Sequence, residues 1–230
     1  MHHTLTSLFA VMMTITAPVT QVGDIAICAV SEQVSGDQFM FTGHCPRFSG
    51  IGDAKAQKSL NAQMHEIVQG ALFRTKAAAA VLPTDDRSEQ QKAEGVFGYE
   101  VKRNGGGVVS LLFTDTLYAG RADTKQAKTG LSFYTGNGEV FDLIGLFMNS
   151  EEGMEQINKE VSRQLTERGL VTALQKQNPK IEAEQQFYLT NTDLVLIIPE
   201  TTWFRREMGT VEFIIPFAKM NRCLKNQFAQ

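Results

Sequence analysis

The sequence lacks the short motifs that mark the common covalent and nucleotide-dependent active sites. It contains no G-x-S-x-G turn, no H-E-x-x-H helix, no C-x-x-C pair and no Walker loop. Residues 128–130, Lys-Thr-Gly, match one motif of penicillin-binding enzymes. Those enzymes also need a serine with lysine three positions later, and no serine in this chain has one. We therefore expect no catalytic residue and no cofactor, and we expect that the protein is not an enzyme.

A strongly basic charge is also missing. The sequence has 22 Lys and Arg against 25 Asp and Glu, which gives a formal net charge of -3 and a pI near 5.8. A phosphate backbone would favour a clustered basic surface, so we expect no nucleic-acid partner. Hydrophobic residues make up 43% of the 230 residues, and the 15 Phe indicate aromatic packing in a core.

Candidate metal ligands are few. His44, Cys45 and His65 could converge if the first predicted helix folds back on the first hairpin, but they lack the paired spacing of zinc sites. The carboxylate pairs at 85–86 and 151–152 fit a loop and a helix start, where negative charge meets the helix dipole. We expect no bound metal. Glycosidase carboxylates are defined by their separation in space, so the sequence leaves that alternative open.

The N-terminus carries an apolar stretch, residues 5–19, that ends in Ala17 and Pro18. It is too short to span a bilayer, which needs ~20 residues. Its length and small-residue end are typical of a secretory signal, although only His2 and His3 precede it, without Lys or Arg. We assign residues 1–22 to a signal peptide and expect an extracytoplasmic protein, periplasmic or secreted, without a transmembrane anchor. A buried N-terminal helix is the alternative.

Three cysteines are present, and two of them flank a predicted turn. Cys28 and Cys45 lie on either side of residues 34–38, and a two-residue loop at Gly36-Asp37 would place them directly opposite each other. A cross-strand disulfide between Cys28 and Cys45 is then sterically possible. Two independent buried thiols are the alternative, and Cys223 stays unpaired in both cases.

Residues 23–95 are predicted to form an N-terminal subdomain of one hairpin and one helix. The hairpin strands are expected at 25–30 and 39–43. Apolar residues then recur at three- and four-residue steps, which marks one face of a helix that Asp53 can cap. They are Ala56, Leu60, Met64, Ile67 and Ala71.

Residues 96–230 are predicted to form an α+β domain, an antiparallel sheet of hairpins packed on one long amphipathic helix. The helix begins after a cap at Asn149 and ends in a left-handed turn at Gly169. Its apolar stripe consists of Met154, Ile157, Val161 and Leu165. The strands are expected at 97–101, 108–117, 131–134, 139–141, 185–190, 193–198 and 211–215.

Five segments, taken in order, resemble the RsiV-like family. They are C-P-R-F-S-G-I-G-D-A-K-A-Q-K-S-L-N-A-Q-M at 45–64, Y-E-V-K-R-N continuing to L-L-F-T-D-T-L-Y-A-G at 99–120, L-S-F-Y-T-G-N-G-E-V-F-D-L-I-G-L-F at 131–147, F-Y-L-T-N-T-D-L-V-L-I-I-P-E at 187–200 and E-F-I-I-P-F at 212–217. The similarity covers about residues 24–228 without large gaps. Members of that family are extracytoplasmic domains, which occur in the lysozyme-sensing anti-sigma factor and next to peptidoglycan deacetylase domains.

The resemblance implies a non-enzymatic binding domain for a cell-envelope ligand. That ligand would be a peptidoglycan-related glycan or a protein such as lysozyme, and we expect the domain to be a monomer. Two other classes remain as alternatives. One is a glycan-acting enzyme with an unrecognised carboxylate pair, and the other is a structural envelope protein.

We place the ligand surface on two connections, 119–129 and 200–209, because loops on a rigid sheet commonly carry recognition. Where relatives show a G-G-A-H-like turn, Arg121 and Asp123 replace a small residue and the His, which puts contacts through that turn in doubt. The second connection groups aromatic residues with Arg, as binding hot spots do, although Trp203 could instead be a core side chain. The predicted ligand-binding residues are Tyr118, Gly120, Arg121, Asp123, Trp203, Phe204 and Arg205.

Overall fold

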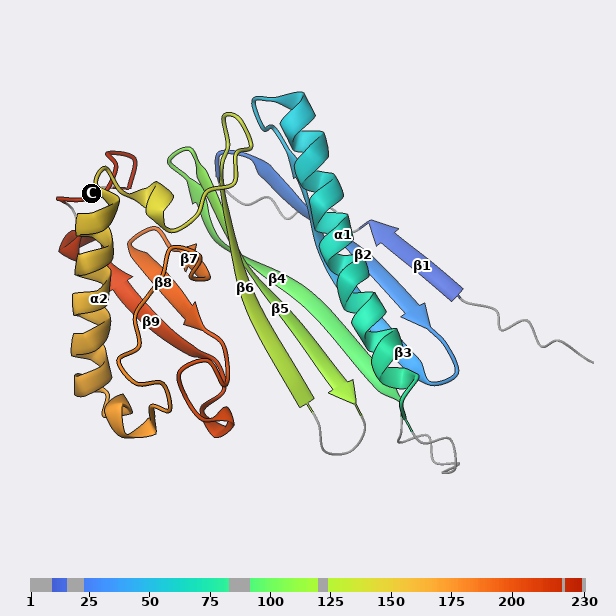
Figure 1. Cartoon of the computed structure of the whole chain (residues 1–230). Coiled ribbons are helices and arrows are strands. Elements are labelled where there is room, and N and C mark those ends of the chain that lie inside the picture. Colours follow the sequence, from blue (N-terminus) through green and yellow to red (C-terminus); the bar gives the residue numbers. More distant parts are fainter. Residues whose placement is uncertain (1–9, 16–22, 83–91, 120–123, 221, 229–230) are drawn as a thin grey trace, which may run out of the picture.

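The chain folds into four layers, with a helix on the outer side of each of two packed sheets (Figure 1). This computed structural model describes residues 10–15, 23–82, 92–119, 124–220 and 222–228. Helix α1 (Ala54–Ala79) covers one face of the first sheet, and helix α2 (Ser150–Glu167) covers the outer face of the second. The α+β class predicted from the sequence is confirmed.

The first sheet is mixed, because the hairpin predicted as part of an N-terminal subdomain joins the predicted antiparallel strands through a parallel pair. Its strands lie in sequence order, and β3 and β4 are the parallel pair because α1 carries the chain back along the sheet between them. The strands are β1 (Ala10–Ile15), β2 (Ala26–Ser35), β3 (Phe39–Ser49), β4 (Ala93–Gly105), β5 (Val108–Ala119) and β6 (Thr124–Tyr134).

Helix α1 begins where the sequence predicts. The Asp53 carboxylate accepts hydrogen bonds from the backbone N–H groups of Lys55 and Ala56 and so caps the first turn. The buried face of α1 differs from the predicted stripe in that Val68 is buried in place of Ile67, which is 37% exposed. The buried residues of α1 are Leu60, Met64, Val68, Ala71, Leu72, Thr75 and Ala79.

Helix α2 and the strands packed on it lie at the predicted positions, but these strands form a sheet of their own, whereas the prediction placed them in one sheet with β4–β6. The strands β7 (Phe187–Leu189), β8 (Asp193–Ile198) and β9 (Val211–Pro216) form an antiparallel sheet with β8 in the centre. Asn149 caps α2 through the backbone N–H groups of residues 151 and 152, and Gly169 has a φ of 65° in the left-handed region.

Strand β5 joins the layers, because its side chains alternate between the two faces of the first sheet. Leu111 and Phe113 pack in the core beneath α1, whereas Leu112 packs against the second sheet. The residues that Leu112 meets there are Tyr188, Val195 and Ile197. The other face of the second sheet forms a core with α2, so each layer is buried on the side where it meets the next.

The hairpin predicted at 131–134 and 139–141 is confirmed only in part, as one antiparallel bridge with two backbone hydrogen bonds across the turn. Residues 131–134 are the second half of β6, which begins at Thr124 and pairs with β5 over its whole length. Residues 139–141 make a single bridge, from Val140 to Phe133. The predicted connection 119–129 therefore reduces to residues 120–123, which lie outside the described part of the chain.

The predicted register of the first hairpin is wrong. Ser35 faces Met40, so the turn is longer than two residues, and Cys28 lies opposite Arg47 while Cys45 lies opposite Val30. The two cysteines are diagonal neighbours on one face of the hairpin, and both are free thiols. Cys223 is also a free thiol and is buried in the other core.

One predicted segment contains a strand, and one predicted boundary falls inside a strand. Within the predicted signal peptide, residues 1–22, the segment Ala10–Ile15 forms β1 and pairs with β2; the rest lies outside the described residues. The predicted boundary at residue 95 lies in β4, which shares the sheet with β3 and β5.

Candidate functional site

The predicted ligand-binding residues separate into exposed, buried and undescribed positions. Tyr118 is 42% exposed near the end of β5, and Arg205 is exposed. Trp203 and Phe204 are 2% and 0% exposed and pack with Phe213 in the core beneath α2. Trp203 is therefore a core side chain, as the alternative interpretation has it. Gly120, Arg121 and Asp123 lie outside the described residues.

The structure nevertheless brings the two predicted connections together in one cleft of about 400 Å³, here called the β6 cleft. It lies at the outer edge of β6, where the chain leaves β8. Its walls come from α1 (Arg74), β5 (Asp115 and Leu117), the first half of β6 (Lys125, Gln126, Ala127, Lys128 and Thr129), the end of β8 (Pro199 and Glu200), Thr210 and Gln186.

Two ion pairs fix charged side chains in the walls of the β6 cleft. The Nε and Nη2 atoms of Arg74 donate to Oδ2 of Asp115 at 2.9 and 2.6 Å. The Lys128 ammonium donates to Oε1 of Glu212 at 2.8 Å and ties β6 to β9 of the other sheet. Glu212 also accepts from the Tyr188 hydroxyl, whose pKa is raised by burial and by the charge of Glu212. Tyr188 therefore remains a hydrogen-bond donor at neutral pH.

The backbone of the β6 cleft has two unusual features. Strand β6 is the last strand of its sheet, so the edge along residues 124–129 faces away from β5 (Figure 1). Thr201, directly after Glu200, has a φ of 63°, which a β-branched residue adopts at a cost. Such strain is frequent where a backbone is held for binding.

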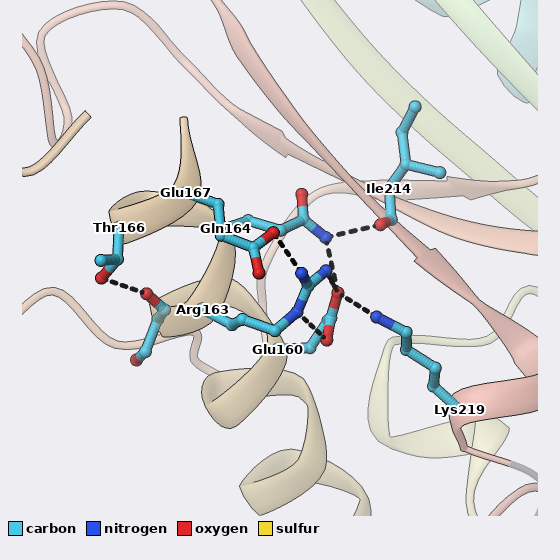
Figure 2. Close-up of polar contacts among 8 residues, drawn as sticks. Glu160, Arg163, Gln164, Thr166, Glu167, Ile214 and Lys219 are labelled. Atoms are coloured by element: carbon cyan, nitrogen blue, oxygen red, sulfur yellow. Dashed lines mark hydrogen bonds and ion pairs between the residues drawn. The ribbon is translucent and has the colours of Figure 1, made fainter. Parts of the chain in front are cut away.

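A carboxyl group with a strongly lowered pKa lies elsewhere, on α2 (Figure 2). Glu160 accepts from Arg163, Gln164 and Lys219, and the Gln164 amide also donates to the carbonyl of Ile214 at 2.7 Å. Hydrogen bonds from Arg163, partly opposed by burial, together with those from Lys219 and Gln164 lower the pKa of Glu160 to about 2. This network fastens α2 to β9 and to residue 219. The network has a structural role, because the Glu160 carboxylate already accepts hydrogen bonds from Arg163, Gln164 and Lys219.

We expect Glu160→Gln to destabilise the fold at neutral pH by about 2 kcal/mol. The lowered pKa corresponds to a stabilisation of roughly 3 kcal/mol. Solvent screening reduces this stabilisation, because Arg163 and Lys219 are half exposed. A carboxyl whose folded pKa lies below its usual 4.5 stabilises the fold fully above that pH and loses the contribution as the pH falls toward 2. In urea unfolding, the free energy of unfolding of Glu160→Gln should thus be lower than that of wild type at neutral pH, and the difference should shrink in acid. Glu155→Gln, at an exposed position, is the control. An equal difference at both pH values would contradict the network.

The proposed trio of metal ligands does not converge. Cys45 and His65 border the same hollow beside α1, but His44 points to the opposite face of β3 and its Nδ1 lies 2.9 Å from the Ser31 hydroxyl. Among the residues that the structure covers, no three His, Cys, Asp or Glu side chains are grouped as a metal site. No helix in that same part is long and apolar enough to cross a membrane.

A family of known sequences matches the part of the chain that contains the second sheet and α2. Residues 145–218 match the family described as "Protein of unknown function (DUF3298)". The DUF3298 region begins just before α2 and ends just after β9, so it contains the second sheet and its helix. No curated protein matches the chain.

Solved structures resemble the chain over nearly its whole length. A DUF3298 family member from Bacteroides fragilis (BF2082) has a TM-score of 0.61 at 14% identity and covers 96% of this chain and 95% of its own. A DUF3298 family protein from Pseudomonas aeruginosa (PA4972) has a TM-score of 0.56 at 12% identity, with 97% and 96% covered. At these identities the similarity shows a shared fold.

The residues predicted from the sequence include part of the β6 cleft and not the rest. Residues 125–129 and Glu200 belong to the two predicted connections, whereas Arg74 and Asp115 do not. A signal for Asp115 exists, because it lies between Phe113 and Leu117 on one strand face and so places a carboxylate within an apolar row. Arg74 has no such signal, since it lies on the polar side of α1.

Proposed function

We propose that the protein is a non-enzymatic binding domain that acts outside the cytoplasm and holds a protein ligand of the cell envelope, such as lysozyme, in the β6 cleft. The observation that carries the proposal is the position of the cleft along the edge of β6. An edge strand presents backbone N–H and C=O groups that an extended segment of another protein can pair with.

The charges of the β6 cleft support recognition of a protein surface. Arg74 and Asp115 lie on one side of the edge, and Lys128 and Glu212 on the other. Charges of both signs in fixed positions favour one partner and one register over others. The hydrogen bond from the Gly130 N–H to the Gln186 side chain indicates that alternate residues of β6 direct their N–H groups outward.

The extracytoplasmic location rests on the sequence. Residues 5–19 have the length and small-residue end of a secretory signal, and the order of segments resembles the RsiV-like family. Fractionation of the source cells tests this part. Full-length, uncleaved protein in the cytoplasm would contradict it.

A matched pair of variants at Gln126 tests the binding mode. Gln126 lies four residues before Gly130, so its N–H also points outward, and Gln126→Pro should remove that donor while keeping the bonds between β5 and β6. Gln126→Ala removes the side chain alone. We expect wild type and Gln126→Ala to bind immobilised lysozyme. Gln126→Pro should lose about tenfold in affinity, because the ligand carbonyl that loses its donor is left unsatisfied at a cost of about 1–3 kcal/mol.

The other outcomes separate the competing functions. Equal binding by both Gln126 variants would show that the ligand does not pair with β6. Binding to purified peptidoglycan instead of lysozyme would identify a glycan ligand. Release of soluble fragments from peptidoglycan would identify an enzyme. Lys159→Ala, on the exposed side of α2, serves as the control for nonspecific charge effects.

A further inference from the structure

A second hollow, the α1 groove, lies between α1 and the hairpin of β2 and β3, away from the β6 cleft. Its volume is about 440 Å³, and its floor is formed by Val30, Cys45 and Pro46. The helix wall is held to the hairpin by Asn61, whose side chain accepts from the Phe48 N–H at 2.8 Å and donates to the Phe48 carbonyl at 3.0 Å. The groove is therefore preformed.

One end of the α1 groove is acidic. Glu32 lines it, is 7% exposed, and accepts two hydrogen bonds from the Gln69 amide, at 3.1 and 2.9 Å. No Lys, Arg or His in the described ranges forms an ion pair with Glu32. A buried carboxylate held by a neutral amide alone is only partly compensated for its lost hydration, so a cationic ligand group would be stabilised beside it.

The other end is basic. Arg47 and Lys58 both line the groove and are exposed, and neither forms an ion pair with a carboxylate of the described residues. In the register of the hairpin, Arg47 lies four strand positions from Glu32, which corresponds to about 13 Å. Lys58 lies about 16 Å along α1 from Gln69, the partner of Glu32, so it belongs to the same end as Arg47.

The floor between the two ends is uncharged. Val30 and Cys45 face each other there. Burial, reinforced by the negative charge of Glu32, raises the pKa of the Cys45 thiol to about 11, so the thiol is protonated at neutral pH. The groove thus offers a negative charge, an apolar centre and a positive pair in a row.

We infer that the α1 groove binds a short peptide with free ends, its ammonium group beside Glu32 and its carboxylate beside Arg47 and Lys58. Three extended residues span about 10 Å. The remaining distance between the two ends is spanned by the charged side chains themselves, which extend toward the centre of the groove from Glu32, Arg47 and Lys58. Small side chains fit the apolar centre. The inference stands apart from the β6 cleft and does not depend on the function proposed for it.

Calorimetric titration of the full chain with three forms of trialanine tests the inference. The forms are the free peptide, the N-acetylated peptide and the C-amidated peptide. We expect the free peptide to bind, and each capped form to bind about tenfold or more weakly, because each cap removes one charged contact. No binding of the free peptide at millimolar concentration, or equal affinity for all three, would overturn the proposal.

Variants of the groove locate the two ends. Glu32→Gln keeps an acceptor for Gln69 and should weaken the free peptide while leaving the N-acetylated peptide unchanged. Lys58→Ala should weaken the free peptide while leaving the C-amidated peptide unchanged. Lys55→Ala, exposed on the same helix and outside the groove, is the control. If Lys58→Ala and Lys55→Ala behave alike with every peptide and Glu32→Gln has no effect, the peptide binds elsewhere and the site is wrong.

Discussion

Val161→Asp should abolish soluble expression of the protein. Val161 is 2% exposed and packs between α2 and the second sheet, in the core that also contains Ile157 and Leu165. An aspartate there would be buried without a cationic partner, at a cost of roughly 3–5 kcal/mol. A domain of this kind has a total stability of about 5–15 kcal/mol, so the loss removes much of it. Comparison of soluble and total protein after expression measures the effect.

Lys159→Asp provides the matched control two residues away. Lys159 is exposed on the opposite side of α2, and an aspartate at that position stays hydrated. Changes at exposed sites away from specific contacts shift stability by about 0.5 kcal/mol or less. The control variant should therefore remain soluble. Loss of solubility in both variants, or in neither, would mean that Val161 does not face the core.

The parts of the fold that the sequence predicted are those whose signals are local. The caps at Asp53 and Asn149 and the left-handed end at Gly169 lie at the positions that their side chains and backbone preferences indicate. The stripe of α2 was readable because the helix packs on one side only. The strands of the second sheet also have a local signal, because each is a short apolar run between turns.

The first half of β6 escaped prediction because its residues have no apolar alternation. Ala127 is the one apolar residue between 124 and 129, and all of these residues except Lys128 are exposed. The strand exists because β5 supplies backbone partners, which is a tertiary effect. The open edge that makes β6 a candidate binding strand is thus also the reason for its weak signal.

The hairpin register and the pairing of β3 with β4 depend on contacts that the sequence does not display. A turn longer by two residues moves Cys45 from opposite Cys28 to opposite Val30. The parallel pair depends on the path of α1 across the sheet. Trp203 was ambiguous for a related reason, since an aromatic residue beside Arg is compatible with both a binding surface and the edge of a core.

The β6 cleft depends on the close approach of the two sheets at Gly130. A Cβ atom at this position would lie 1.6 Å from the carbonyl oxygen of Phe187, which belongs to β7. A backbone atom cannot rotate away as a side chain can, so Gly130→Ala must push β6 and β7 apart. Lys128, two residues earlier, would then lose its contact with Glu212 across the same junction.

We expect Gly130→Ala to destabilise the protein by more than about 2 kcal/mol, at the upper end of the usual cost of overpacking. For a chain of this size, a loss of about 2 kcal/mol lowers Tm by roughly 4–8 °C. Gly98→Ala is the matched control, because the added methyl at this position in β4 meets no atom within 4 Å. It should be neutral or slightly stabilising, since alanine restricts the unfolded chain. Thermal unfolding of the two variants side by side distinguishes the outcomes. Equal Tm values would show that the sheets do not meet at Gly130, and the junction that adjoins the β6 cleft would be absent.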